Sequence, residues 1–324
     1  MNNKVLLIDP GKGWGHFVSK IYCFRELSKQ LGKKIIFLTK SSTQAKSYLE
    51  QQDFCEKVIY LNDYNLSAKS LSKKISNFFK DVKTIKELKV DSCYVFHPSL
   101  RYIMLANFAG IKNIYGLGKK LQQFFLKKNN KLYKSYFSEA VPGDPEARDF
   151  VKKLFSLKEI KFEPMFKSEE KKKDYVAIGI ASSELFKRWP IDNYIKLIEH
   201  LYNNNFKKIL IISGKDQKND EEKIRNFFSE QSIDFVFTSD KKISEVMSYI
   251  LKSKLYIGND TGFAHLFINC SVKSYIIYGS CDPQYYSDLM NHIDHDSNTE
   301  RSETSIYSIT IEKVIKSIEK ELVF

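Results

Sequence analysis

A glycine-rich segment near the start of the chain has the composition of a ligand-binding loop. Residues 10–16 read PGKGWGH, and Gly13 and Gly15 let the backbone approach a ligand closely and leave N–H groups available at the start of a helix. The G-x-G-x-G spacing matches neither the dinucleotide fingerprint nor the Walker A loop. His16 ends the segment and can act as a general base near neutral pH. A tight strand-to-helix turn with an ordinary surface histidine is the alternative.

A second segment combines hydroxyl groups with positive charge. Residues 181–190 read ASSELFKRWP. Ser182 and Ser183 can donate to phosphate oxygens, and Lys187 and Arg188 supply positive charge beside the start of a helix. This composition predicts a cradle for a diphosphate group. The alternative is a solvated helix start that covers a buried tryptophan.

A third segment carries an acid, a hydroxyl group, a glycine and a histidine at the start of a helix. Residues 258–265 read GNDTGFAH. Asp260 or Thr261 can serve as an ordinary helix cap, but capping requires only one such residue. Gly262 leaves the helix N-terminus accessible to an anion, with His265 at the same end. We therefore predict an anion site here, with Asp260 available to bind sugar hydroxyl groups.

Two further loops follow predicted strands, and one acidic cluster resembles a metal site. The loops are YGSCDP at residues 278–283, after what we expect to be the last strand, and SGKD at residues 213–216, which contains Gly214. Neither loop is specific by itself. The sequence Asp294-His295-Asp296 resembles the Asp-x-Asp metal motif of some sugar transferases, but we expect it in a polar loop with no strand before it. We therefore predict no metal site.

Short apolar runs alternate with longer helical patterns along the chain, as in α/β proteins whose parallel strands are covered on both faces. We expect strands at residues 4–9, 34–39, 57–61, 93–97, 113–117, 175–181, 208–213, 235–238, 255–258 and 275–278. We expect helices at residues 18–31, 43–51, 67–88, 100–109, 192–203, 220–230, 244–252, 264–269 and 306–324. This order predicts doubly wound α/β sheets, in which ligands bind beyond the carboxyl ends of the strands.

The alternation weakens between residues 119 and 173, which contain a Pro-Gly turn cluster and the charge run KSEEKKKD. We therefore predict two Rossmann-like domains that face a central cleft, at residues 1–165 and 174–305. The last helix, at residues 306–324, is expected to pack back toward the first domain.

Length and composition lead us to expect a cytoplasmic protein with two domains. The 324 residues suit two domains of about 150 residues each. No apolar run approaches the roughly 20 residues of a membrane-spanning helix, and the first residues are too polar for a secretory signal. The five cysteines form no CxxC pair, which favours reduced thiols over disulfides or zinc.

Positive charge is concentrated in one part of the sequence. Subtracting 39 Asp and Glu from 52 Lys and Arg leaves a net charge of +13. Residues 92–138 contain no acid, but they carry Arg101 and seven lysines interleaved with aromatic residues. The basic aromatic residues at 101–137 predict contact with an anionic inner-membrane surface or a phosphorylated glycolipid. A merely solvated surface is the alternative. Single-stranded nucleic acid would suit the same mixture, but no nucleic-acid motif accompanies it.

Together these segments resemble glycosyltransferase family 9, the heptosyltransferases of lipopolysaccharide assembly. The most specific likeness is DTGFAHL at residues 260–266, which is similar to the D-[TS]-G-x-x-H motif of that family. KRWP at residues 187–190, followed by Tyr194 and Leu197, is similar to a second family segment. The resemblance covers nearly the whole chain and is strongest over residues 175–285.

The resemblance implies a GT-B fold, with the acceptor on the first domain and the nucleotide-sugar on the second. It implies an inverting transfer without metal or other cofactor, usually from ADP-heptose, onto a lipopolysaccharide, lipooligosaccharide or capsular glycan. Such an enzyme would be peripheral on the inner face of the cytoplasmic membrane. A UDP- or GDP-sugar donor, a sugar-nucleotide epimerase and an inactive nucleotide-sugar-binding protein are the alternatives.

The resemblance also implies roles for single residues. Ser182, Ser183 and Lys187 would hold the diphosphate, and Asp260 would bind the sugar. The phosphate pocket would be completed by Thr261, Gly262 and His265. The family has its catalytic aspartate directly after a glycine of the first loop, whereas here His16 follows Gly15. The catalytic base is therefore expected to be His16 or Asp9.

Overall fold

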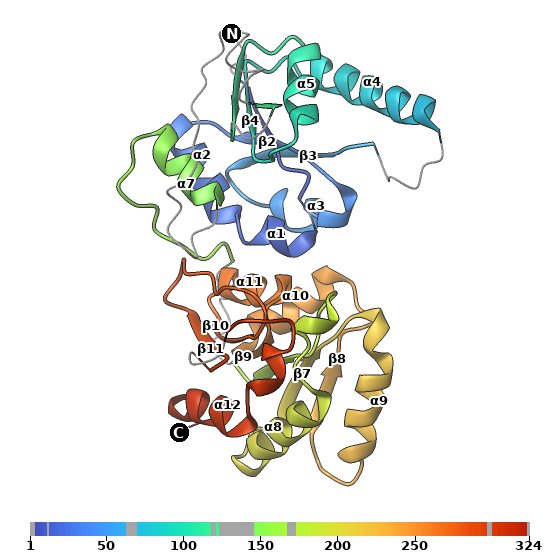
Figure 1. Cartoon of the computed structure of the whole chain (residues 1–324), viewed down its shortest axis with the longest axis vertical. Helices are drawn as coiled ribbons and strands as arrows, with labels where there is room; N and C mark the ends of the chain where they lie inside the picture. Colours follow the sequence, from blue (N-terminus) through green and yellow to red (C-terminus); the bar gives the residue numbers. More distant parts are fainter. Residues whose placement is uncertain are drawn as a thin grey trace. The chain divides into compact units, whose positions relative to one another are not determined.

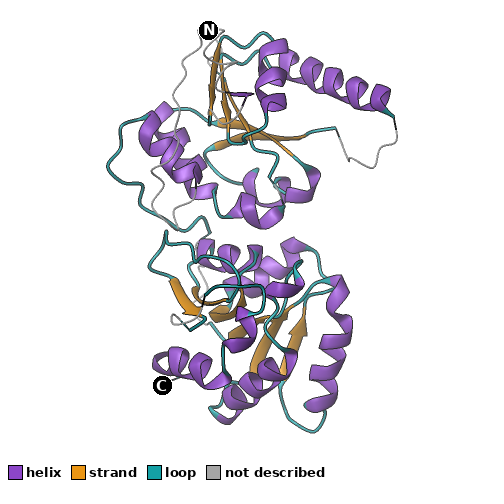
Figure 2. Ribbon diagram, viewed as in Figure 1, coloured by secondary structure: helices purple, strands orange, loops and turns teal. Residues whose placement is uncertain are grey.

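The computed structural model describes residues 4–11, 13–62, 70–117, 121–122, 146–166, 173–296 and 300–322. The chain divides into two compact units, Met1–Ile160 and Lys161–Phe324. Each unit is an α/β domain with one parallel sheet (Figure 1, Figure 2). The α/β fold with two Rossmann-like domains that the sequence predicts is confirmed.

The first unit contains a five-stranded sheet in the order β3-β2-β1-β4-β5. All four strand pairs are parallel. Its elements are β1 (Val5–Ile8), α1 (Trp14–Val18), α2 (Ile21–Leu31), β2 (Ile35–Thr39), the 3₁₀ turn η1 (Ser41–Thr43), α3 (Lys46–Leu49), β3 (Cys55–Tyr60), α4 (Leu71–Glu87), β4 (Ser92–Val95), α5 (Leu100–Phe108), β5 (Asn113–Gly116) and α7 (Glu146–Leu154).

Strand β1 lies in the middle of this sheet, and its side chains are buried on both faces. Leu6 and Ile8 belong to the core on one face, together with residues of α4 and α5. On the other face, the ring of Phe24 packs against Phe37 and Phe96, with centroids 5.7 and 5.2 Å apart. Burial on both faces is the reason that the parallel strands have nearly continuous apolar sequences.

The second unit contains a six-stranded parallel sheet in the order β11-β10-β9-β6-β7-β8. Its elements are β6 (Tyr175–Gly179), η2 (Leu185–Lys187), α8 (Ile191–Asn203), β7 (Lys208–Ile212), η3 (Lys215–Gln217), α9 (Lys218–Phe227), β8 (Asp234–Phe237), α10 (Ile243–Leu251), β9 (Ser253–Asn259), α11 (Gly262–Asn269), β10 (Lys273–Tyr278), β11 (Met290–Asp294), η4 (Ser305–Ser308), α12 (Ile311–Ile318) and η5 (Glu319–Glu321).

Two glycines allow the central strands of this sheet to pair closely. Gly179 of β6 lies opposite Gly258 of β9. A Cβ atom on Gly258 would lie 2.5 Å from the backbone of Gly179, closer than atoms can approach. Gly258, the first residue of the predicted GNDTGFAH segment, therefore has a packing role at the strand end.

Strand β11 is a correction to the sequence analysis. Asp294 is its last residue, so the Asp294-His295-Asp296 sequence does follow a strand, and β10 is not the last strand. The strand escaped notice because it lies at the sheet edge with a single partner. Only Met290 and Ile293 of its five residues are buried, too few for a clear apolar run. Helix α7 likewise lies in the region where the predicted alternation weakens.

The C-terminal residues form a shorter helix than predicted. Thr310 caps α12, and its hydroxyl group accepts a hydrogen bond from the Lys313 N–H group, 3.3 Å away. Val314 and Ile318 are completely buried in the core of the second unit. The cap sets the helix start, and these two side chains attach the helix to the second unit. Packing of this helix toward the first domain stays a prediction. No helix within the described ranges combines the length and apolarity required to cross a membrane.

Candidate functional site

The loop after β1 is closed by a buried carboxylate. Asp9 is completely buried, and its two oxygens accept from the Gly11 N–H group at 3.0 Å and from Lys20 Nζ at 2.7 Å. Gly11 has a φ of +59°, which favours glycine at this turn. The Asp9 side chain therefore holds the turn together.

Helix α1 begins directly after this turn and carries the predicted histidine. Gly13 precedes the helix in an extended conformation, and Gly15 lies in its first turn. The His16 side chain is exposed, whereas the next residue, Phe17, is completely buried. The side chain of His16 is therefore accessible to a ligand, unlike that of Asp9.

The two serines after β6 differ in accessibility. Ser182 is buried, and its hydroxyl group donates to the Glu184 carbonyl at 3.0 Å and accepts from the Glu184 N–H group at 3.3 Å. Ser183 is exposed. The hydroxyl group of Ser182 thus stabilises the turn, and the hydroxyl group of Ser183 is accessible to a ligand.

Arg188 connects two loops of the second unit. Its guanidinium group donates to the Ser182 carbonyl from Nε at 2.9 Å and from Nη2 at 2.6 Å, and it pairs with Asp216. The predicted residue Gly214 begins the loop that contains Asp216, and its N–H group donates to Gln217 Oε1 at 2.7 Å. Both predicted residues thus hold the loops that follow β6 and β7.

Lys187 and Asp260 form an ion pair between the loop after β6 and the end of β9. Lys187 Nζ lies 3.2 Å from Asp260 Oδ2 and 3.6 Å from Glu184 Oε2. The two paired side chains are 22% and 17% exposed. Partial burial lowers the pKa of the Lys187 ammonium group, but Asp260 and the adjacent Cys281 outweigh it and raise that pKa above its usual value. Lys187 is therefore a fixed positive charge that a ligand can reach.

Helix α11 begins two residues after Asp260, one member of this ion pair. Thr261 occupies the N-cap position, but its side chain makes no capping hydrogen bond. Its hydroxyl oxygen is buried near the Tyr256 hydroxyl group, which instead donates to the Asn259 carbonyl at 3.1 Å. Gly262 is the first helical residue and adds no side chain. The first turn of α11 therefore lacks the ordinary cap that the alternative interpretation requires.

His265 lies one turn further along α11 and is 5% exposed. Its Nδ1 atom lies 2.6 Å from the Tyr286 hydroxyl group, and its Nε2 atom lies 3.9 Å from Asp260 Oδ1. The Tyr286 hydroxyl group thus orients the imidazole ring, with Nε2 toward Asp260. The sequence analysis did not identify Tyr286.

Asn259 is a second residue that the sequence analysis missed. It is the completely buried last residue of β9, and its Nδ2 group donates to the Ile180 carbonyl at 3.0 Å. Its Oδ1 atom accepts from the Trp189 N–H group at 3.0 Å and lies 2.9 Å from the Tyr194 hydroxyl group. Asn259 therefore fixes the loop that carries Lys187 relative to Asp260. A buried polar residue at a strand end was the available signal.

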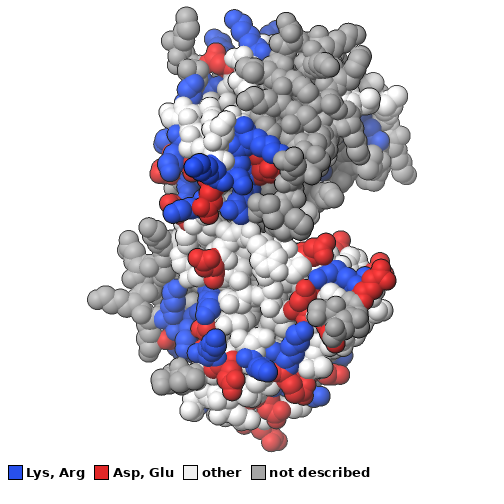
Figure 3. Space-filling view, turned by 60° about the vertical axis from the view of Figure 1, so that its left-hand side comes forward, with Lys and Arg blue, Asp and Glu red and all other residues white. Residues whose placement is uncertain are grey.

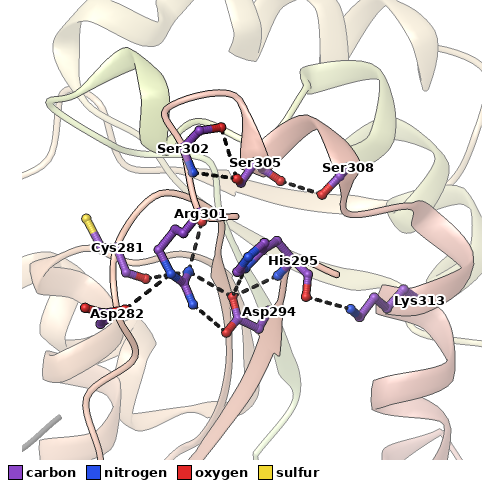
Figure 4. Close-up of polar contacts among 10 residues, drawn as sticks. Cys281, Asp282, Asp294, His295, Arg301, Ser302, Ser305, Ser308 and Lys313 are labelled. Atoms are coloured by element: carbon purple, nitrogen blue, oxygen red, sulfur yellow. Dashed lines mark hydrogen bonds and ion pairs between the residues drawn. The ribbon is translucent and has the colours of Figure 1, made fainter. Parts of the chain in front are cut away.

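Arg301 was also missed, and it organises the loop after β10 (Figure 4). Its Nη1 group donates to the carbonyl oxygens of Gly279 at 2.9 Å and Cys281 at 2.8 Å. The same guanidinium group holds both oxygens of Asp294, with distances of 3.0 and 2.7 Å. Its Nε atom lies 3.3 Å from the exposed carboxylate of Asp282. Arg301 therefore joins this loop to the end of β11.

The loop that Arg301 holds reaches the Lys187 segment. The Ser280 hydroxyl group donates to the Phe186 carbonyl at 2.8 Å, and Cys281 lies beside the Lys187 ammonium group. A Cβ atom on Gly279 would lie 2.4 Å from Ile306, so only glycine fits at the start of this loop. The contacts connect Arg301 indirectly to Lys187.

The carboxylate of Asp294 is committed to Arg301 and His295. Partial burial raises the pKa of Asp294, but the hydrogen bonds from Arg301 and His295 outweigh it and lower that pKa below its usual value. The structure thus gives the Asp-x-Asp-like sequence an ion pair with arginine. Across the described residues, no group of three or more His, Cys, Asp or Glu side chains is arranged to hold a metal ion.

Of the predicted basic aromatic patch at residues 101–137, residues 118–120 and 123–137, which contain six of its seven lysines, lie outside the described residues. The described part includes Arg101, which is partly exposed, and Lys112, which is exposed. On the face in Figure 3, basic and acidic side chains of the described residues are interspersed over both units.

Two tandem parallel α/β units with polar loops at the strand ends are the architecture of the GT-B fold. The model of glycosyltransferase family 9 (heptosyltransferase) matches residues 79–313, or 235 of the 324 residues. The chain therefore belongs to glycosyltransferase family 9. No curated protein matches the chain.

Solved structures of this family have the same fold. ADP-heptose lipopolysaccharide heptosyltransferase II of E. coli aligns over 98% of both chains, with a TM-score of 0.77 and 16% identity. A family 9 glycosyltransferase of Veillonella parvula aligns over 99% of this chain and 97% of its own, with a TM-score of 0.76 and 15% identity. E. coli heptosyltransferase WaaC, solved with ADP-2-deoxy-2-fluoro heptose, aligns over 98% and 99%, with a TM-score of 0.74 and 14% identity.

Proposed function

We propose that this glycosyltransferase moves heptose from ADP-heptose onto a lipopolysaccharide, lipooligosaccharide or capsular glycan, with inversion and without metal. The observation that carries the proposal is the accessible Lys187–Asp260 pair, whose aspartate directly precedes the N-terminus of α11. A cation and a helix N-terminus suit a nucleoside diphosphate, and a carboxylate suits sugar hydroxyl groups. The ADP-heptose analogue named with E. coli WaaC supports this choice of donor.

Binding of the donor would separate Lys187 from Asp260 and give each of them a new partner. Its diphosphate takes the place of Asp260 on Lys187, and the sugar hydroxyl groups donate to the released carboxylate. Ser183 and the N–H groups at Thr261 and Gly262 add donors to the phosphate oxygens. As the anomeric C–O bond breaks, negative charge increases on the departing diphosphate. Lys187 and the α11 N-terminus stabilise this charge, a role that a metal ion has in other transferases.

His16 is the proposed base, and its accessibility favours it over Asp9. Asp9 is completely buried and accepts from Gly11 and Lys20, so an acceptor hydroxyl group has no access to it. The exposed imidazole of His16 removes the proton from the acceptor hydroxyl group. The acceptor oxygen then bonds to the anomeric carbon, and the nucleoside diphosphate leaves with the electron pair of the broken bond. This single displacement inverts the anomeric configuration.

The acceptor would be anchored in the inner face of the cytoplasmic membrane. The net charge of +13 supports association with an anionic surface. The basic aromatic residues at 101–137 remain our proposed contact with the phosphorylated acceptor or its membrane. We propose no role for nucleic acid.

Calorimetric titration with ADP, UDP, GDP and CMP tests the donor site, first without metal and then with Mg²⁺. We expect ADP to bind most tightly without metal, and Lys187→Ala to weaken binding. Lys241→Ala is the control, because Lys241 pairs with Glu245 at 2.6 Å on the surface of the same unit. Tighter binding of UDP or GDP would indicate a UDP- or GDP-sugar as the donor instead of ADP-heptose. Failure of all four nucleotides to bind would overturn the proposal.

A further inference from the structure

The apolar face of helix α4 changes from buried to exposed along the helix. Val82 and Ile85, near its C-terminal end, belong to the core of the first unit. The same face continues toward the N-terminus as Leu71, Ile75 and Phe79, at a spacing of four residues. Their side chains are 74%, 50% and 53% exposed. One face of a helix is thus a core contact at one end and an uncovered apolar surface at the other.

The exposed turns of α4 extend beyond the part of the helix that packs on α5 (Figure 1). Phe108, the last residue of α5, enlarges the exposed surface and is itself 53% exposed. Its ring lies 5.8 Å from Phe78 and 6.3 Å from Phe79. We call Leu71, Ile75, Phe79 and Phe108 the α4–α5 apolar stripe. Scattered single apolar side chains are normal on a protein surface, whereas a contiguous group marks a contact.

Lysines surround this stripe. By their positions around the helix, Lys74 lies on one side of the stripe and Lys83 on the other, and Lys86 lies in line with Ile75 and Phe79 beyond the C-terminal end of the stripe. Lys112 is exposed shortly after the end of α5. The two acids of α4 do not neutralise the positive charge of these lysines. Asp81 is buried and accepts a hydrogen bond from Asn62 Nδ2 at 2.6 Å. Glu87, at the far end of the helix, is the remaining acid of α4.

We propose that the α4–α5 apolar stripe docks on a membrane that contains anionic phospholipid. The apolar side chains enter the boundary between head groups and acyl chains, and the long lysine side chains reach the phosphates around them. A second copy of the chain fits less well, because its stripe would bring the same lysines against these. The proposal deepens the membrane location in the proposed function and assigns it to described residues outside the proposed donor site.

Vesicle co-sedimentation tests this surface with the full chain. We expect binding to phosphatidylcholine vesicles that contain phosphatidylglycerol, and weak binding to phosphatidylcholine alone. The variant Ile75→Ser/Phe79→Ser removes apolar area from the stripe and should weaken binding about tenfold or more. Phe227→Ser is the matched control, because Phe227 is 51% exposed on helix α9 of the other unit. It should bind like the wild type.

A charge variant separates the contribution of the lysines to membrane binding from that of the apolar side chains. Lys83→Glu/Lys86→Glu should weaken binding and reduce its dependence on salt, since each lysine contributes attraction to an anionic surface. Lys223→Glu, on the exposed side of α9, is its control. Unchanged binding in Ile75→Ser/Phe79→Ser would overturn the proposal. A concentration-dependent dimer that this variant abolishes would also overturn it, in favour of a second copy.

Nucleotide titration of the same variants distinguishes this proposal from the proposed function. We expect normal nucleotide affinity and melting temperature in Ile75→Ser/Phe79→Ser, because these exposed side chains lie outside the donor site. If the wild type binds nucleotide normally but binds no vesicles, the membrane-docking proposal is refuted and the donor-site proposal is not. Vesicle binding without nucleotide binding would sink the donor proposal alone.

Discussion

Each unit has an aspartate that directly follows a central strand of its sheet and pairs with a lysine, and the two carboxylates differ in exposure, whereas the two lysines, at 19% and 22%, do not. Asp9 follows β1 and lies 2.7 Å from Lys20, whereas Asp260 follows β9 and lies 3.2 Å from Lys187. The Asp9 side chain is 0% exposed, and that of Asp260 is 17% exposed. Asp9 also accepts from the Gly11 N–H group, which completes a closed turn.

This difference indicates what each pair can do. A carboxylate that is fully buried loses its hydration and depends on its partners, so removing one partner is costly. A partly exposed pair can exchange partners with a ligand at small cost, because water and ligand atoms compensate both charges. The same two residue types therefore form a structural pair in the first unit and a proposed donor-binding pair in the second.

The largest change in activity is expected for substitution of His16, the accessible candidate for the base, in contrast to the buried Asp9. His16→Ala should lower kcat by about two to four orders of magnitude, because a general base contributes this much. Steady-state kinetics with a saturating donor measure the effect, and the melting temperature should stay near that of the wild type. Unchanged turnover would remove His16 from the mechanism.

Disruption of the buried pair should affect stability. Asp9→Ala leaves the Gly11 N–H group and Lys20 without their acceptor. It should lower the free energy of unfolding by about 3 kcal/mol or more, since each hydrogen bond to a charged group contributes about 1.5–3 kcal/mol. Urea denaturation measures this change. Asp174→Ala is the control, because Asp174 pairs with Lys208 at the surface. A stable but inactive Asp9→Ala protein would contradict the structural role and make Asp9 the base.

Disruption of the accessible pair should affect catalysis. Lys187→Ala should lower kcat by about 10²–10³-fold, the usual effect of removing one group that stabilises transition-state charge. Its unfolding free energy should change by about 1 kcal/mol or less, because the pair is partly exposed. Lys241→Ala should behave like the wild type in both assays. Wild-type turnover in Lys187→Ala would refute the leaving-group role.

The smallest effect is expected at Arg301, which acts through the loop that it holds. Arg301→Ala should raise the KM for the donor by about tenfold with kcat within about twofold, since hydrogen bonds from a charged group are lost. Arg301→Lys should fall between wild type and Arg301→Ala, because lysine keeps the charge but not the fork geometry. Arg225→Ala is the control, since Arg225 stacks on Phe237 of the same unit. An unchanged donor KM in Arg301→Ala would limit Arg301 to a structural role.

The sequence by itself determined the strand-and-helix order and the class of fold. Buried parallel strands such as β1, β2 and β7 have continuous apolar sequences, and this pattern is local to each strand. The loop segments at residues 181–190 and 258–265 were identified by their residue types, and the structure joins them through Lys187 and Asp260. An edge strand such as β11 has a weaker signal, because it is covered on fewer sides.

Only the tertiary structure decided which polar residues lie together and which are accessible. Arg301 lies in a polar stretch of sequence, and its partners come from the loop after β10 and the end of β11. The sequence offered His16 and, as the other candidate, Asp9; in the structure Asp9 is buried and His16 is exposed. The physical reason is that the apolar periodicity of a strand or helix depends on residues that are close together in the sequence. Hydrogen-bond partners and solvent access are instead set by segments that meet only after folding.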